Sequence, residues 1–265
     1  MSDHEYLLDN RAAAAGARLH ALAAVFDATT FRHIDALGVE AGSHCWEVGA
    51  GGDSVVRGLA ARCGPSGRVL ATDIEVGQMG ADPLPGVEVR RHDVGRDAPP
   101  DEAFDLVHAR LVLVHVTARD AALRSMAQAL RPGGWLLVED ADPALQPLAC
   151  LDPATDEEHL ANRIRTGFRQ LMAARGAELA YGRTLPGRLR RVGLVDVAAD
   201  AYFPVALPAC NALEAATIAL IRDDLVEHGI ASAEDLERHL AAVAAGRLDL
   251  AQPPLVSAWG RRPAD

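Results

Sequence analysis

Two glycines and one carboxylate in the first third of the chain have the types and spacing of a nucleotide-binding site. Gly49 and Gly51 follow an apolar run that ends at Val48, and Asp73 ends the next apolar run. Glycine lets a turn adopt conformations closed to other residues, and it lets the backbone approach a ligand closely. A carboxylate after the following strand can accept hydrogen bonds from both hydroxyls of a ribose. The pattern predicts a strand, a glycine turn, a helix and a second strand that together hold a nucleoside.

Two further residues decide which nucleoside suits this turn. The dinucleotide fingerprint has a third glycine at the position of Ser54, where it allows close packing of the helix. Glu47 precedes the first glycine by two residues, and a carboxylate there is unfavourable beside a pyrophosphate but suits a ligand with an ammonium group. S-adenosylmethionine carries such a group. The residues therefore favour S-adenosylmethionine over a nicotinamide dinucleotide.

Five motifs together resemble those of the class I S-adenosylmethionine-dependent methyltransferases, over roughly residues 42–140. They are Glu47–Gly52, Asp73, His92–Asp93, Phe104–Val107 and Leu130–Gly134. The glycine motif alone is a weak signal, whereas five motifs in the order and spacing of the family are specific. The resemblance implies a Rossmann-like methyltransferase fold, an α/β fold with a mostly parallel, seven-stranded sheet whose last strand is antiparallel.

The resemblance also implies a cofactor site at the ends of the strands. Its residues are Glu47, Gly49, Ala50, Gly51, Asp73, Ile74, Asp93, Val94, Ala109, Arg110 and Arg32. Asp73 is expected to hold the ribose because it accompanies the glycine turn, and a surface cap is its alternative interpretation. Asp93 falls where the family places a group that receives the adenine amino group, with Val94 beside the ring. A plain turn aspartate is the alternative interpretation of Asp93.

Charges around the methionine end of the expected ligand leave alternatives open. Asp53 stands where the family more often has glycine or a small residue, and it can cap the following helix or shift cofactor affinity in either direction. Arg110, after the fourth strand, and Arg32, in a leading helix, are the candidates to neutralise the methionine carboxylate. Each arginine, taken singly, also fits a surface or lid salt bridge.

Methyl transfer from a sulfonium is an in-line displacement that depends mostly on proximity and orientation. A general base is needed only when the acceptor must lose a proton. His108 and His115 flank the end of the fourth strand, at the edge where ligands bind in open α/β sheets. We expect His115, and secondly His108, to act as this base. A histidine hydrogen-bonded between helix and sheet is the alternative.

The acidic run Glu139–Asp142 after the fifth strand invites comparison with the metal-binding, catechol-type methyltransferases. Those enzymes also have acidic ligands after the fourth strand, where this chain has His108–Arg110. We therefore expect no metal. Glu139 or Asp140 is then an acceptor-binding residue or a plain strand-end carboxylate.

Composition disfavours several other classes of protein. The 265 residues carry a formal net charge of −11, which disfavours nucleic acid as a partner, and the arginine cluster at 188–191 is interpreted as a solvated helix end. All 26 basic residues are arginine, so Schiff-base chemistry and a GxxxxGK phosphate loop are excluded. The four cysteines form no CxxC pair, which disfavours a zinc site. No apolar run approaches the roughly 20 residues of a membrane span and no secretory signal is visible, so a cytoplasmic location is expected.

Periodicity and turn residues predict alternating strands and helices up to residue 140 and helical insertions beyond it. Strands are expected at 45–48, 68–72, 87–91, 104–107, 135–139, 194–198 and 254–260. Helices are expected at 6–26, 30–37, 54–63, 120–130, 156–178, 212–227 and 233–245, with another after Thr184. Glycines and prolines between Asp73 and Val87 predict that the helix there is short or absent.

These elements predict a helical cap, residues 1–40, and a cofactor-binding methyltransferase domain, residues 41–265. Helical insertions at about 143–185 and 204–246 are expected to form lids that select the acceptor. The same helices are suited to a homodimer interface.

We therefore expect a methyltransferase that acts on an oxygen, nitrogen or carbon atom of a small organic metabolite, with neither a nucleic acid nor a membrane as partner. The first alternative is a protein of this fold that keeps S-adenosylmethionine as a structural element, either a cyclase or rearrangement enzyme or a binding module. The second is a nicotinamide-dependent oxidoreductase, which Ser54, Glu47 and the closing pair of strands disfavour.

Overall fold

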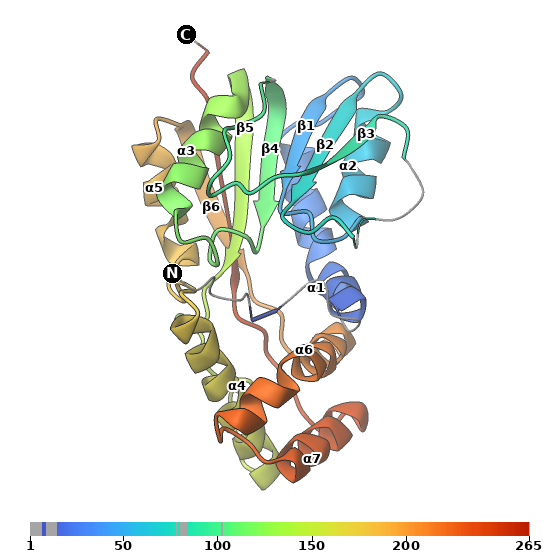
Figure 1. Cartoon of the computed structure of the whole chain (residues 1–265), viewed down its shortest axis with the longest axis vertical. Helices are drawn as coiled ribbons and strands as arrows, with labels where there is room; N and C mark the ends of the chain where they lie inside the picture. Colours follow the sequence, from blue (N-terminus) through green and yellow to red (C-terminus); the bar gives the residue numbers. More distant parts are fainter. Residues whose placement is uncertain (1–6, 9–14, 78, 80–83, 102, 265) are drawn as a thin grey trace.

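The computed structural model describes residues 7–8, 15–77, 79, 84–101 and 103–264, and its centre is a seven-stranded sheet (Figure 1). The strands are β1 (His44–Val48), β2 (Arg68–Asp73), β3 (Val87–Arg91), β4 (Phe104–Arg110), β5 (Leu130–Ala141), β6 (Val195–Tyr202) and β7 (Leu255–Arg261). Their order is β3-β2-β1-β4-β5-β7-β6. The pairs among β1 to β5 are parallel, and β7 is antiparallel to both β5 and β6. The predicted fold class, including the antiparallel last strand, is confirmed.

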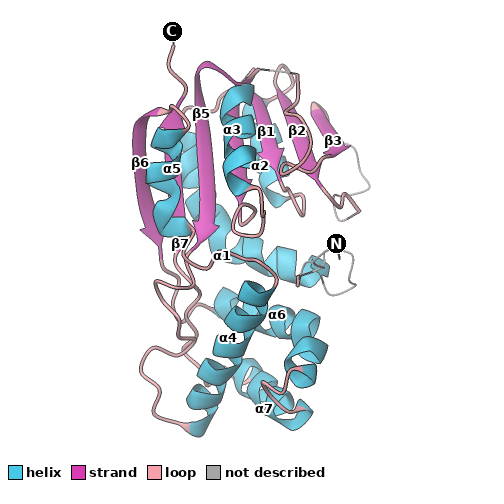
Figure 2. Ribbon diagram, turned by 60° about the vertical axis from the view of Figure 1, so that its left-hand side comes forward, coloured by secondary structure: helices cyan, strands magenta, loops and turns pink. Residues whose placement is uncertain are grey.

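Helices cover both faces of the sheet. They are α2 (Ser54–Cys63) on one face, and α3 (Arg119–Ala129) and α5 (Leu185–Arg191) on the other (Figure 2). Alternate residues of one strand serve the two faces, as the period of a strand requires: on β5, Leu136 packs in the cluster that contains α3 and α5, whereas Leu137 packs in the cluster that contains α2. Burial on both faces explains why the central strands are nearly continuous apolar runs.

A separate helical lobe lies beyond the carboxyl ends of the parallel strands (Figure 1). It consists of α4 (Asp156–Ala174), α6 (Pro208–Glu227) and α7 (Ala233–Ala244). Apolar side chains such as Leu160, Ile218 and Leu236 form its core, and the N-terminal Leu7 and Leu8 pack into the same cluster. The chain enters the lobe after β5, leaves it for β6, and enters it again between β6 and β7.

The helix α1 (Ala15–Ala36) joins the lobe to the sheet (Figure 1). Val25 and Phe26 pack against Leu213 of α6, while Phe31 packs with the cluster that contains α2. Residues 9–14 lie outside the described part of the chain, as does the predicted helix start at residue 6. The predicted division into two helices is wrong, because the chain continues as one helix through Thr29 and Thr30, both of which are buried.

Other element boundaries also differ from prediction. The fourth and fifth strands are longer than predicted, since β5 already begins at Leu130, in the segment expected to stop the preceding helix. Helix α4 ends at Ala174 because Gly176, with a φ of 87°, leaves the helical conformation. Among the described residues between β2 and β3 no helix is present, which agrees with the expectation of a short or absent one there.

The contact between α1 and α2 depends on Gly58. A Cβ added at this residue would lie 2.1 Å from Cζ of Phe31, so the ring would have to move. We expect Gly58→Ala to lower the free energy of unfolding by about 1–2 kcal/mol, because overpacking outweighs the gain in helix propensity. Urea denaturation measures this change. Gly187→Ala in α5 is the matched control: its Cβ would meet the flexible Arg191 guanidinium at 3.3 Å, so stability should stay equal or rise. Equal stability of Gly58→Ala and wild type would contradict the packing.

Candidate functional site

The turn between β1 and α2 has the backbone that its glycines predict. Gly49 and Gly51 have φ values of 64° and 61°, in the left-handed region that favours glycine. A Cβ at Gly49 would lie 2.3 Å from Cγ2 of Val112, so this position has no room for a side chain. The amide of Ala50 donates to the carbonyl of Thr72 at 3.0 Å and fixes the turn to the end of β2. The turn is therefore a rigid cradle at the carboxyl edge of the sheet.

Asp73 lies directly beside this turn. Its carboxylate accepts hydrogen bonds from the backbone amides of Gly51 and Glu75, each at 2.9 Å, and it is 6% exposed. Burial raises the pKa of Asp73, while the amides oppose that rise. The next residue, Ile74, is half exposed, as a side chain that packs on a planar ring would have to be. The geometry thus suits the predicted ribose and adenine contacts, which stay predictions.

Asp93 occupies a turn of its own. Its carboxylate accepts from the amide of Gly95 at 2.9 Å and pairs with Arg96 at 3.5 Å, and Val94 beside it is buried. The turn role that was the alternative interpretation is therefore present in the structure. A hydrogen bond from adenine to the same carboxylate stays a prediction.

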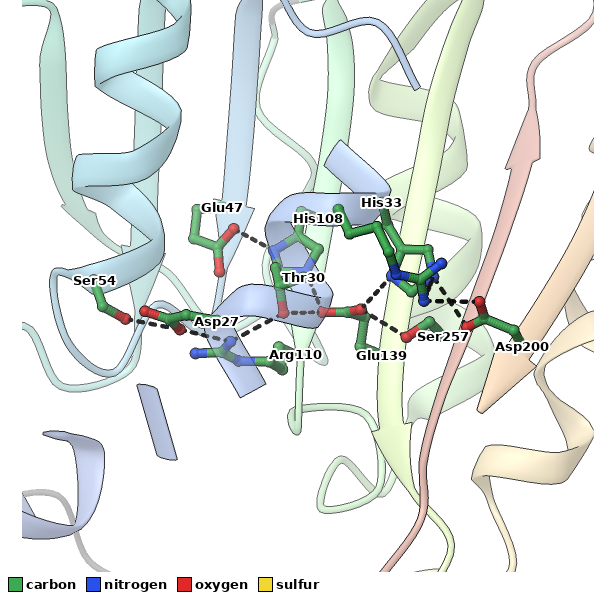
Figure 3. Close-up of polar contacts among 11 residues, drawn as sticks. Asp27, Thr30, His33, Glu47, Ser54, His108, Arg110, Glu139, Asp200 and Ser257 are labelled. Carbon is green, nitrogen blue, oxygen red and sulfur yellow. Dashed lines mark hydrogen bonds and ion pairs between the residues drawn. The ribbon is translucent and has the colours of Figure 1, made fainter. Parts of the chain in front are cut away.

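The two candidate arginines lie in different places. Arg110 is nearly buried and donates to Asp27 and Thr30 of α1 at 2.9 and 3.0 Å, and Asp27 also accepts from Ser54 at the start of α2 (Figure 3). Arg32 is exposed and pairs with Asp200 of β6 at 2.8 Å. Arg110 thus lies near the glycine turn, with the buried Ala109 before it, and it is the arginine that we retain for the methionine carboxylate.

A chain of carboxylates and imidazoles crosses the same edge of the sheet (Figure 3). Oε2 of Glu47 lies 2.6 Å from Nδ1 of His108, whose Nε2 lies 3.3 Å from Oε2 of Glu139. Oε1 of Glu139 lies 3.2 Å from Nδ1 of His33, whose Nε2 lies 3.0 Å from Asp200. The first four residues are at most 3% exposed. We call these five residues the acid–histidine chain.

Glu139 is the centre of the acid–histidine chain. Besides the two histidines, its carboxylate accepts hydrogen bonds from Thr30 of α1 and from Ser257 of β7, the latter at 2.7 Å. Burial alone would raise the pKa of Glu139, but the bonds from His108, His33 and Thr30 lower it well below its ordinary value. Glu139 is therefore ionised, and it joins α1 to strands β4, β5 and β7.

Both histidines of the chain favour the charged form. Burial lowers the pKa of His108, but Glu47 and Glu139 outweigh it and raise the pKa to about 9. Burial likewise lowers the pKa of His33, and the neighbouring Glu139 and Asp200 again produce a net rise. The acid–histidine chain thus alternates three acidic side chains with two imidazoles whose pKa values are raised by their neighbours.

The structure places the two candidate bases in unlike surroundings. Both ring nitrogens of His108 are engaged, so a positioning role for Glu47 suits it better than proton abstraction from an acceptor. His115 lies in the loop after β4, where burial and the guanidinium groups of Arg18 and Arg119 lower its pKa to about 3. Its imidazole is therefore neutral. Asp140 is fully buried, and burial raises its pKa, which favours the neutral carboxylic acid.

Sequence reasoning singled out Glu47, His108 and Glu139 separately and missed His33 and Asp200. The missing signal is the sheet register: Glu47 lies opposite His108, and Ser257 lies opposite both Glu139 and Asp200. That register is set by the pairing of strands that lie far apart in the sequence. Helix α1 then supplies His33, which contacts Glu139. No local pattern in the sequence contains this information.

Two searches of the described residues complete the description of the site. In the described ranges no group of three or more His, Cys, Asp or Glu side chains is arranged to hold a metal ion. None of the helices in the same ranges is long and apolar enough to span a membrane.

Comparisons with known proteins agree with this geometry. Residues 46–138 match the family model described as a methyltransferase domain. The ubiquinone/menaquinone biosynthesis C-methyltransferase UbiE of Hahella chejuensis is 32% identical over 123 residues, which make up 43% of this chain and 49% of that protein. The chain thus spans about half the length of the curated relatives it matches.

Solved structures share the fold at low sequence identity. Phosphoethanolamine N-methyltransferase 2 of Haemonchus contortus, in complex with S-adenosylhomocysteine, gives a TM-score of 0.61 at 13% identity over 99% of this chain and 61% of that chain. The [4+2]-cyclase SpnF gives a TM-score of 0.51 at 14% identity over 97% of this chain and 86% of that chain.

Fold, strand order and glycine turn together define a Rossmann-like protein whose glycine turn lies at the carboxyl edge of its sheet. Residues 46–138 match a methyltransferase-domain family, and this match supports the predicted resemblance to the class I S-adenosylmethionine-dependent methyltransferases. The methyl donor of that family is S-adenosylmethionine, which is also the cofactor predicted from Glu47 and Ser54.

The raised pKa of His108 predicts a pH dependence of stability. Folding favours protonated His108, so its contribution is complete below its ordinary pKa of 6.5 and is lost as the pH rises through about 9. We expect the free energy of unfolding to fall by on the order of 2 kcal/mol over this window in wild type and by less in His108→Asn. Denaturant titrations at several pH values measure the difference.

His115→Gln is the control for this experiment. Because the pKa of His115 is lowered to about 3, its contribution changes only between that value and its ordinary 6.5. The variant should therefore keep the wild-type slope above pH 6.5. Parallel slopes for wild type and His108→Asn would show that His108 is not held as an ion.

Proposed function

We propose that this protein is a methyltransferase that transfers the methyl group of S-adenosylmethionine to an oxygen, nitrogen or carbon atom of a small organic molecule. The observation that carries the proposal is the pair of carboxylates beside the glycine turn: Asp73, bonded to the turn amide of Gly51, and Glu47, at the end of β1. One suits a ribose diol and the other an ammonium group.

The residues around the turn fit this ligand in other respects. Gly49 and Gly51 have a left-handed backbone conformation and no side chain, so a ligand can lie close to the turn. Ile74 offers an exposed apolar surface. Arg110 supplies a cation whose present partner is Asp27 of α1. When bound, S-adenosylmethionine supplies an activated methyl group, so the protein has mainly to orient the two reactants.

We assign to the chain's own residues roles that fit their positions. Asp73 and Glu47 fix the two ends of the cofactor, and Arg110 neutralises its carboxylate. We assign the lobe of α4, α6 and α7, which lies beyond the carboxyl ends of the strands (Figure 1), to covering the acceptor. His115 is neutral, and a pKa of about 3 makes it a weak base, so it orients an acceptor by hydrogen bonding better than it removes a strongly held proton.

The acceptor class is inferred from charge and from named relatives. A formal net charge of −11 disfavours a nucleic acid as acceptor, and the helical lobe resembles a cover over a small molecule. The UbiE relative is named a quinone-biosynthesis C-methyltransferase, which makes a quinol-like ring the first acceptor class to test. The phosphoethanolamine enzyme makes small amines the second. A homodimer and a cytoplasmic location stay predictions.

A second candidate function is a cyclisation or rearrangement with S-adenosylmethionine as a structural element. The observation that favours it is the shared fold of the [4+2]-cyclase SpnF. Methyl transfer needs no obligatory nucleophile, so the site residues are compatible with both functions. Stoichiometric release of S-adenosylhomocysteine during turnover distinguishes the methyltransferase.

Removal of the ribose carboxylate tests the cofactor site. We expect wild type to bind S-adenosylmethionine and S-adenosylhomocysteine in calorimetry, and Asp73→Ala to lose at least about 10-fold in affinity, because buried amides and ribose hydroxyls lose their acceptor. Asp120→Ala, an exposed residue of α3, is the control and should bind as wild type. Absence of binding to wild type would sink the proposed function.

The arginine beside the turn gives a ligand-dependent prediction. Arg110→Gln should weaken S-adenosylhomocysteine binding about 10-fold or more, through loss of a charge-assisted hydrogen bond to the carboxylate. Binding of 5′-methylthioadenosine, which has no amino acid group, should change little. Arg32→Gln is the matched control and should affect neither ligand, since Arg32 pairs with Asp200. Equal weakening of both ligands by Arg110→Gln would refute this assignment.

A further inference from the structure

Glu47 is a buried residue, and one of its two carboxylate oxygens faces a hydrogen-bond partner among the described residues. Its Oε2 faces His108 at 2.6 Å, and its side chain is 2% exposed. In the described part of the chain no hydrogen-bond donor reaches its Oε1. This oxygen is therefore available to accept a hydrogen bond from a cationic ligand.

The charges around Glu47 balance before any ligand binds. In the acid–histidine chain, Glu47 and Glu139 face His108 and His33, whose pKa values these carboxyl groups raise. At the outer end Asp200 pairs with both His33 and the exposed Arg32.

The neighbouring charged groups do not disturb this balance. Arg110, beside Thr30, is itself paired with Asp27 at 2.9 Å. Thr30 of α1 and Ser257 of β7, which also face Glu139, are neutral. With the ligand carboxylate at Arg110, an ammonium group docked at Glu47 adds a second positive partner to the carboxylate that His108 already faces.

We propose that His108 is a positioning residue that couples cofactor binding to the release of a proton. The ligand ammonium binds beside Glu47, and His108 gives up one proton in exchange. The inference rests on the proposed function, because it needs the ammonium group of the ligand to bind at Glu47. It extends that function by naming the residue that sets the charge of the site.

The exchange balances in atoms and charge. One N–H bond of the His108 imidazolium breaks, its electron pair stays on the nitrogen, and the proton goes to the buffer. Hydrogen-bonded groups lead outward from Nε2 of His108 through Glu139 and His33, at 3.3, 3.2 and 3.0 Å, to Asp200, whose side chain is 39% exposed. A proton therefore has a continuous route from the buried imidazole to solvent.

The sign of the effect follows from linkage. In the free protein the pKa of His108 is raised to about 9, so the ring is charged at pH 8. A ligand that binds better when the ring is neutral lowers that pKa, and its affinity then rises with pH by up to about 10-fold per unit between the two values. The ligand's own ammonium group titrates in the opposite sense, so the comparison of variants isolates the part of His108.

The test is calorimetry of S-adenosylhomocysteine binding at pH 8 in buffers of different ionisation enthalpy, which counts the protons released. Wild type should release up to about one proton more than His108→Asn, whose amide can still donate to Glu47. His239→Gln is the matched control: this buried histidine pairs with Glu214 of the lobe at 3.0 Å, and its removal should leave the proton count unchanged. With wild type, 5′-methylthioadenosine should release no such proton.

A second measurement needs no variant. The ring signals of His108, followed by NMR against pH with and without S-adenosylhomocysteine, should show a lower titration midpoint in the complex. Equal proton counts for wild type and His108→Asn, or an unchanged midpoint, would overturn the inference while leaving the proposed function intact. Failure of wild type to bind S-adenosylhomocysteine would instead overturn both.

Discussion

The carboxylate of Glu139 is the interaction on which the arrangement of the site depends. It is fully buried at the carboxyl edge of the sheet, and it receives hydrogen bonds from α1, β4 and β7. An ionised group in such a place is stable only with several donors, because the cost of its desolvation is large. The donors include His108 and His33, and each of these imidazoles reaches a further carboxylate. Glu139 thereby fixes the long helix α1, the His108 side chain beside Glu47, and the closing strands β6 and β7 relative to one another.

From this constraint the functional geometry follows. Helix α1 is held over the sheet edge by Thr30 and His33, and its Asp27 contacts both Arg110 and the start of α2. The glycine turn lies between these groups and the end of β2, where Asp73 holds it through the amide of Gly51. The carboxylates of Glu47 and Asp73 and the guanidinium group of Arg110 thus lie around the backbone of the glycine turn. The helices α4, α6 and α7 of the lobe supply none of these groups.

The sequence predicted the fold and the strand-turn-helix-strand unit that carries the candidate site, because both depend on short-range patterns. Gly49, Gly51 and Asp73 belong to one strand-turn-helix-strand unit, and the structure has that unit where it was expected. The two-helix interpretation of the N-terminus failed because tertiary hydrogen bonds of Asp27 and Thr30 compensate the low helix propensity of these residues. His33, Asp200 and Ser257 could not be predicted as site residues, since only the register of β5, β7 and β6 brings them to Glu139.

A crystal structure of the complex with S-adenosylhomocysteine tests the central claim most directly. We expect the ribose hydroxyls on the carboxylate of Asp73 and the ligand ammonium within hydrogen-bond distance of Oε1 of Glu47, with Oε2 still facing His108. A ligand whose amino group points away from Glu47, or a nucleoside bound elsewhere than the turn of Gly49 and Gly51, would contradict it.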